Sequence, residues 1–250
     1  MRRRPSRAWT VVLAALSVLW SFALLPPQMV VWAGSGTPGW LLALDRLPGY
    51  DATRALLAGA GIADDYLVFG SAVALSFVLL WLATGPAFAA LGWSGRTLGA
   101  LVLAGAPITV LSYLNHPVDA PLHAIWGAEA FALLAIGLVA VVAAIAAPRG
   151  RGIPLWERLL VGSTLLVMVG ATLALGYWPH GTLVGFGAEA IALAAFAPRW
   201  AGAPGRVGAP ARDGAAAPLA EPGAPTADEA ARMPATDDDG PHETSRAGRR

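Results

Sequence analysis

The chain contains no cysteine and no lysine, and both absences narrow the chemistry open to it. Without cysteine there can be no disulfide framework, no thiolate metal site and no cysteine nucleophile. Every basic residue is an arginine, and alanine, glycine and proline are abundant. This composition is typical of a GC-rich coding sequence and indicates a high-GC bacterium as the source.

Charged residues are also scarce. They make up 13% of the chain, whereas a soluble domain carries about 25%. Hydrophobic residues reach 56%, and the mean hydropathy is +0.58. We therefore expect an integral membrane protein whose main partner is the lipid bilayer. The net charge of +1 and the lack of a basic patch away from the membrane flanks argue against a nucleic-acid partner.

Several apolar runs are long enough to cross a bilayer, which takes about 20 residues. The predicted spans cover about 9–33, 66–90, 98–114, 121–147, 155–176 and 182–198. Because the backbone of a span must satisfy its own hydrogen bonds, we expect helices throughout. The sequence predicts an all-α integral membrane protein, a six-transmembrane-helix bundle that occupies residues 1–198.

The distribution of arginine predicts the orientation of this bundle. One side of the predicted membrane carries Arg2, Arg3, Arg4, Arg7, Arg96, Arg149, Arg151 and Arg158. The other side carries Arg46 and Arg54 together with Asp45, Asp51, Asp64, Asp65 and Asp119. Since cytoplasmic loops are enriched in basic residues, we expect both termini in the cytoplasm and the protein in the inner membrane.

Three segments of the chain have further predictions of their own. The first span has a second interpretation as a signal peptide cleaved after Ala33, although its apolar run is long for one. Residues 34–65 are either a plain connector or a short helix on the outer surface with Asp51 as its N-cap. Residues 199–250 lack apolar periodicity and are predicted to form a disordered cytoplasmic tail.

The most informative pattern is a near-duplicated stretch. Residues 113–134 read YLNHPVDAPLHAIWGAEAFALL, and residues 177–194 read YWPHGTLVGFGAEAIALA. Both copies hold Tyr-x-x-His followed by Gly-Ala-Glu-Ala, with a longer spacer in the first copy. Together with the preceding spans, the copies predict two parallel hairpin repeats, spans three and four and spans five and six.

This repeat predicts a candidate site of polar residues. Its residues are Glu129, Glu189, His116, His180, His123, Tyr113 and Tyr177. We expect both glutamates at matching depth, about 10–12 Å from the outer helix ends at about 1.5 Å per residue. An acid costs about 2.5–3.5 kcal/mol at the centre of a span, so each must face a helix, a cavity or a cation. Because no arginine lies within a predicted span, we expect at least one of the two to be uncharged near pH 7.

Several functions remain open for this site. One is an outward-facing Glu/His site that binds or transports a proton, a cation or a small polar ligand. A second is a metal site, against which stands the absence of an HxxxH or HxxE pattern. A third is hydrolysis, for which there is no serine in a GxSxG elbow.

The fourth interpretation is structural. In it the chain is a non-catalytic scaffold or accessory subunit, with a membrane protein partner or a second copy, and the buried glutamates lock helix packing. The sequence favours a non-enzymatic protein without a cofactor and names no catalytic residue.

Overall fold

The computed structural model describes residues 6–31, 37–148 and 152–196, and these residues contain helices and no strand. In chain order the helices are α1 (Arg7–Val31), α2 (Gly39–Leu44), α3 (Pro48–Gly59), α4 (Asp65–Ala72), α5 (Ala74–Ala90), α6 (Trp93–Leu114), the 3-10 helix η1 (His123–Ile125), α7 (Ala128–Ala146), α8 (Leu155–Gly162), α9 (Thr164–Leu175) and α10 (Trp178–Phe196). The predicted all-helical class is confirmed for this part of the chain. The predicted tail and the cleavage site at Ala33 lie outside the described residues.

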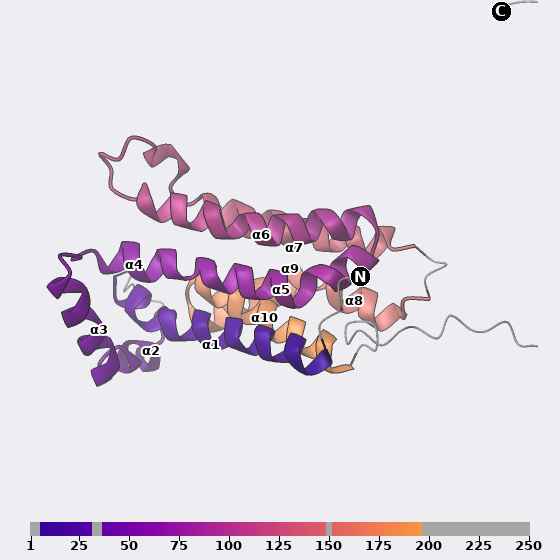
Figure 1. Ribbon diagram of the computed structural model, residues 1–250, viewed down its shortest axis with the longest axis horizontal. Helices are drawn as coiled ribbons and strands as arrows, with labels where there is room; N and C mark the ends of the chain where they lie inside the picture. Colours follow the sequence, from indigo (N-terminus) through magenta and orange to yellow (C-terminus); the bar gives the residue numbers. More distant parts are fainter. Residues whose placement is uncertain (1–5, 32–36, 149–151, 197–250) are drawn as a thin grey trace, which may run out of the picture. The chain divides into compact units, whose positions relative to one another are not determined.

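Within the described residues, four helical segments are long and apolar enough to cross a membrane. They are Arg7–Val31, Asp65–Ala90, Trp93–Leu114 and His123–Ala146. A fifth would be α8 and α9 taken together, which meet at an angle of 48°. Helices α1, α5, α6 and α10 run along the same direction (Figure 1). The chain is therefore a helical membrane protein.

The bend between α8 and α9 has a local cause at Ser163 and Thr164. The Ser163 hydroxyl donates to the carbonyl of Leu160 at 2.7 Å, and the Thr164 hydroxyl donates to that of Val161 at 2.7 Å. Such side-chain bonds to the preceding turn compete with the backbone ladder and bend helices. Two adjacent hydroxyl residues thus place the break at this position.

Helix α10 has 19 residues, and most of them are buried against other helices. It is not among the helices whose length and hydropathy mark them as candidate membrane spans. It packs against α1 and α9 and also touches α5, α7 and α8. Two glycines permit this close packing. A Cβ at Gly185 would lie 2.6 Å from Ala171 Cβ, and one at Gly187 would lie 2.5 Å from Val18 Cγ2. A helix surrounded by other helices needs less apolar surface than one that faces lipid.

The predicted span 121–147 agrees with the candidate span His123–Ala146, but the helix starts predicted near Pro121 and Thr182 were wrong. The first-copy helix begins at Ala128, seven residues after the predicted start at Pro121. Residues between them form turns and η1, and Gly127 adopts a left-handed φ of 84°. The second-copy helix begins at Trp178 rather than Thr182, because Pro179 in its first turn fits a helix start.

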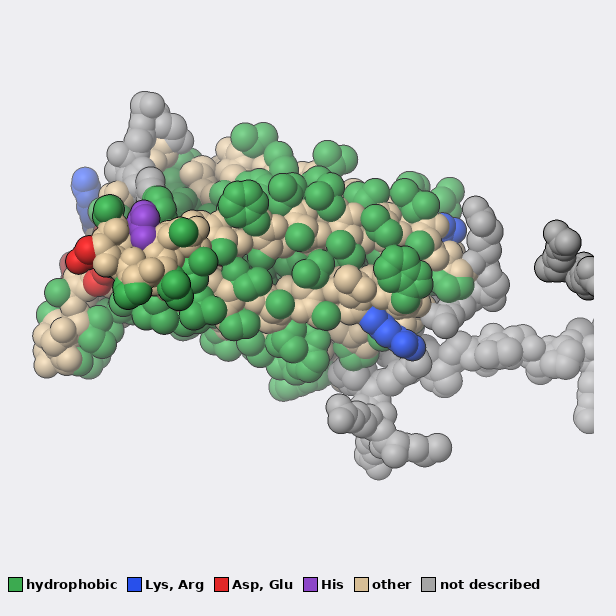
Figure 2. Space-filling model, turned by 90° about the horizontal axis from the view of Figure 1, so that it is seen from above, with side chains coloured by type: hydrophobic (Ala, Val, Ile, Leu, Met, Phe, Trp, Pro, Cys, Tyr) green, Lys and Arg blue, Asp and Glu red, His purple; other side chains and the backbone are tan. Residues whose placement is uncertain are grey.

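The two ends of the bundle differ in charge. The end that contains Tyr66, Tyr113 and Tyr177 is called the tyrosine end, and the end with Arg7, Arg96 and Arg158 is called the arginine end. Hydrophobic side chains cover the middle of the face seen in Figure 2, and its coloured charged side chains lie toward the two ends. The described part of the chain thus has an apolar band between two polar rims, as a bilayer requires.

At the arginine end, guanidinium groups cap helices. Arg7 Nε donates to the carbonyl of Ala194 near the end of α10 at 3.1 Å. Arg158 donates to the carbonyls of Ala144 and Ile145 near the end of α7 at 2.9 and 3.0 Å. Carbonyls of the last helical turn lack partners within the helix and carry partial negative charge, so both contacts stabilise the helix ends.

At the tyrosine end, α2 and α3 form a helical connector. The helix predicted within residues 34–65 is confirmed as α3, but its N-cap is Leu47, and Asp51 lies in its first turn. Arg54 forms ion pairs with Asp45 and with Asp65, the latter at 2.8 Å. The hydrogen bond to Asp45, more than any other contact, raises the pKa of Arg54. This network ties α3 to the start of α4.

Candidate functional site

Three tyrosines converge at the tyrosine end and bring the two repeat copies together. The hydroxyls of Tyr113 and Tyr177 lie 3.0 Å apart. The hydroxyl of Tyr66 interacts with both, and its ring centroid is 5.0 Å from that of Tyr113. Tyr177 also donates to Gln28 Oε1 at 3.4 Å, so α1 joins the cluster. A Cβ at Gly70 would overlap the Tyr113 ring, which is why this position holds a glycine.

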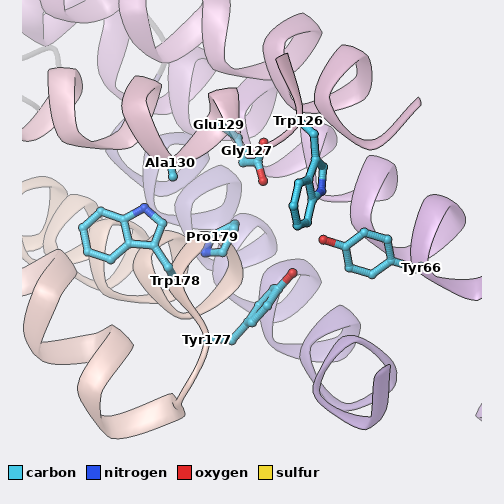
Figure 3. Close-up of a pocket in the computed structure, with 8 residues that line it drawn as sticks. All are labelled: Tyr66, Trp126, Gly127, Glu129, Ala130, Tyr177, Trp178 and Pro179. Carbon is cyan, nitrogen blue, oxygen red and sulfur yellow. The ribbon is translucent and has the colours of Figure 1, made fainter. Parts of the chain in front are cut away.

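A pocket of about 300 Å³ opens beside this cluster. Its lining residues come from α4, the η1–α7 turn, the first turn of α7 and the chain at the start of α10: Tyr66, Trp126, Gly127, Glu129, Ala130, Tyr177, Trp178 and Pro179. The Glu129 carboxylate and the hydroxyls of Tyr66 and Tyr177 point toward the space between them, and the Trp126 ring lies beside it (Figure 3). Aromatic rings therefore form most of the wall, and one carboxylate supplies its acidic charge.

Glu129 is buried and incompletely paired. Its residue is 5% exposed, and its carboxyl group hydrogen-bonds the hydroxyl of Ser112. That hydroxyl also accepts from Gly127 N–H at 2.8 Å. The second carboxylate oxygen, Oε2, has no hydrogen-bond partner within the described residues. As the second residue of α7, Glu129 lies beside the positive end of the helix dipole.

Glu189 occupies a different environment. It is 4% exposed and is the twelfth residue of α10, counting from Trp178. The hydroxyl of Thr164, the first residue of α9, shares its one proton between the carbonyl of Val161 and Glu189 Oε1, at 2.7 and 2.8 Å. Glu189 does not line the pocket around Glu129. The expectation of matching depth is wrong, because the left-handed Gly127 delays the first-copy helix until just before its glutamate.

The histidines of the two copies are also separated. His116 Nε2 lies 3.2 Å from Asp64, and its Nδ1 lies 2.8 Å from the carbonyl of Tyr113. His123 Nδ1 lies 3.1 Å from the carbonyl of Asn115, and its ring stacks on Trp126. These contacts fold the connector between α6 and η1 against α4. His123 thereby supports one wall of the pocket through Trp126.

His180 lies inside the bundle. It is 0% exposed, and neither ring nitrogen has a hydrogen-bond partner in the part of the chain that is described. Its ring centroid is 5.3 Å from that of Tyr177. The structure therefore joins Tyr113, Tyr177 and Glu129 in one region, holds His116 and His123 at its border, and leaves Glu189 and His180 within the packing of α10.

A metal site has little support in this arrangement. Over residues 6–31, 37–148 and 152–196, no group of three or more His, Asp or Glu side chains is placed to hold an ion. The pocket itself offers a single carboxylate as a strong ligand. Structural and catalytic metal sites use three or four protein ligands, which this set does not supply.

The sequence analysis did not identify two tryptophans that line the pocket, nor the side chain of Gln28, which hydrogen-bonds the tyrosine cluster. Trp126 and Trp178 each lie within a repeat copy, yet tryptophans near span ends are expected as interface anchors and do not stand out. Gln28 is an amide within an apolar run and donates to the carbonyl of Tyr66 at 3.1 Å. Gln28 could have been identified from the sequence, because a polar side chain inside a predicted span usually has a function or a partner.

Comparison with protein-family models, curated proteins and solved structures finds no match to this chain. The functional argument therefore depends on the geometry of the pocket and on the chemistry of the groups that line it.

Proposed function

We propose that this chain is a multi-pass bacterial inner-membrane protein that binds, or carries across the membrane, a proton, a cation or a small polar ligand at the pocket around Glu129. In this proposal α8–α9 and α10 complete six spans. The arginine end and both termini lie in the cytoplasm, as the greater number of arginines at that end favours. The pocket at the tyrosine end then faces outward.

A single observation carries the proposal: Glu129 holds a buried carboxylate oxygen without a partner among the described residues, at the wall of a pocket of about 300 Å³. A buried unpaired acceptor costs about 1–3 kcal/mol, and more when it is charged. A bound cation or hydrogen-bond donor in the pocket would remove that cost. Pockets of this size are at the lower end of the range for small-molecule sites, about 300–1,000 Å³.

Glu189 favours a second candidate function, a non-catalytic scaffold or accessory subunit. Its carboxyl group is enclosed in the α9–α10 packing and accepts a hydrogen bond from Thr164. Its Oε2, like that of Glu129, has no hydrogen-bond partner among the described residues, but Glu189 lies within helix packing and not at the wall of the pocket, as expected of an acid that locks two helices together. The two glutamates thus support different functions, and they can be tested separately.

The test compares Glu129→Gln with the matched variant Glu189→Gln. Purified full-length protein is titrated with protons, with Na⁺, with K⁺ and with methylammonium, and tryptophan fluorescence is recorded, since Trp126 and Trp178 line the pocket. We expect at least one probe to change the fluorescence of the wild type and of Glu189→Gln, and to have no such effect on Glu129→Gln.

Two outcomes would contradict the proposal. Either none of the probes changes the fluorescence of the wild type, or both variants respond as the wild type does. In either case the scaffold function becomes the better account of the buried acids.

A further inference from the structure

The walls of the pocket restrict the kind of ligand that fits it. Four of its lining side chains are aromatic, and they are Tyr66, Trp126, Tyr177 and Trp178. Aromatic faces carry a negative quadrupole and attract a cation centred within about 6 Å of the ring. They replace the water around an alkylated ammonium group, whereas a small inorganic cation needs several oxygen ligands.

The charge of the pocket matches such a ligand. Glu129 is the acidic residue of the lining, and the lining includes no basic residue. The nearby His116 is paired with Asp64, and Arg54 is paired with Asp45 and Asp65. His116 and Arg54 are therefore engaged by other acids, and the remaining nearby histidines, His123 and His180, are not among the residues that line the pocket.

The ring arrangement is fixed before any ligand arrives. Tyr66 and Tyr177 are held through the hydroxyl of Tyr113, and Tyr177 is also held by Gln28. Trp126 stacks on His123 with ring centroids 5.7 Å apart. Walls that are already ordered lose little conformational entropy when a ligand binds, which favours affinity.

We infer that the pocket recognises a small organic cation with an alkylated ammonium head, with Glu129 as its counter-ion, the ring of Trp126 as its aromatic wall and the hydroxyls of Tyr66 and Tyr177 at its edge. This inference rests on the proposed function and names the ligand class of the same site. The second glutamate, Glu189, takes no part in recognition.

The experiment is calorimetric titration of the purified full-length protein with choline, with its neutral isostere 3,3-dimethyl-1-butanol, and with Na⁺ and K⁺. We expect choline to bind at least roughly tenfold more tightly than the isostere, because the isostere has the same shape without the charge. Glu129→Gln should lower the affinity for choline about as much, and Glu189→Gln should leave it unchanged.

A second pair of variants tests the aromatic wall and does not depend on the folding of Glu129→Gln. Trp126→Leu removes the ring and should weaken choline binding by roughly 2- to 30-fold. Trp126→Phe keeps a ring and should lie closer to the wild type. Equal losses in both variants would contradict a role for the ring face.

The outcomes separate this inference from the proposed function. If the isostere binds as well as choline, or if Na⁺ or K⁺ binds in a Glu129-dependent way and choline does not, the ammonium class is wrong and the proposed function stands. If no probe binds and the fluorescence titration is also silent, both are wrong.

Discussion

The two copies of the repeat share a sequence motif and differ in structure. In the first copy, the motif glycine, Gly127, has a left-handed φ of 84° and open space where a Cβ would be. In the second copy, Gly187 lies within α10 against Val18. The acid after the first glycine lines a pocket, and the acid after the second is enclosed between helices. The shared motif therefore does not determine where its glutamate lies. The residue at which the helix begins decides how deep and how exposed that glutamate is.

The largest expected effect separates the two glycines. Gly187→Leu should reduce the free energy of unfolding by about 3 kcal/mol, because even its Cβ would lie 2.5 Å from Val18 Cγ2. Gly127→Ala should cost about 1–2 kcal/mol through its positive φ alone. Denaturation of the purified protein in detergent measures both.

Asparagine variants provide the control for that pair, since asparagine tolerates the left-handed conformation. Gly127→Asn should recover most of the loss seen with Gly127→Ala, whereas Gly187→Asn should remain destabilised. Equal behaviour of the two asparagine variants would show that the glycines have the same role.

The two glutamates should differ in how they affect stability. Glu189→Ala should cost about 2 kcal/mol, because it removes the hydrogen bond between α9 and α10 and opens a cavity in the packing, although the Thr164 hydroxyl keeps the Val161 carbonyl as an acceptor. Glu189→Gln retains the shape and the acceptor and should cost much less. Glu129→Ala should cost less than Glu189→Ala, since it borders a pocket that already exists. The same denaturation measurement tests this order, and a larger loss for Glu129→Ala would reverse our assignment of roles.

The strength of the contact between the two copies can be measured at Tyr113 and Tyr177. Tyr113→Phe, Tyr177→Phe and the double variant form a double-mutant cycle for the hydroxyl contact of 3.0 Å. We expect a coupling of about 0.6 kcal/mol, the average for hydrogen bonds between membrane helices. A coupling near zero would mean that the two copies meet without this bond contributing.

The smallest effects concern a contact that both copies have. In each, an arginine from another helix donates to carbonyls at the end of the glutamate-bearing helix. Arg158→Ala removes two bonds to α7, and Arg7→Ala removes one bond to α10. We expect losses of about 0.3–1 kcal/mol, with Arg158 the larger. Arg96→Ala, which alters an exposed arginine at the same end, is the control and should have a smaller effect. A loss for Arg96→Ala as large as for Arg158→Ala would indicate a general charge effect.

The sequence predicted the helical membrane class because long apolar runs leave the backbone few alternatives. It also selected Tyr113, Tyr177 and Glu129, which the structure brings to one region. It did not predict the late start of α7, because the conformation of Gly127 depends on the turn that η1 forms. The pocket walls were missed for a related reason: Trp126 and Trp178 come to line one pocket only through tertiary packing.

The central claim is that the glutamate of the first copy lines an open pocket and the glutamate of the second copy does not. Because the chain has no native cysteine, the matched positions after the two glutamates can be tested with single thiols, using Ala130→Cys and Ala190→Cys. Ala130 lines the pocket, whereas Ala190 is 1% exposed. Sealed right-side-out vesicles are treated with a membrane-impermeant trimethylammonium methanethiosulfonate, and the rate of thiol modification is measured. The account predicts rapid modification at position 130 and none at position 190 over the same time; equal rates, or an inert thiol at position 130, would contradict it.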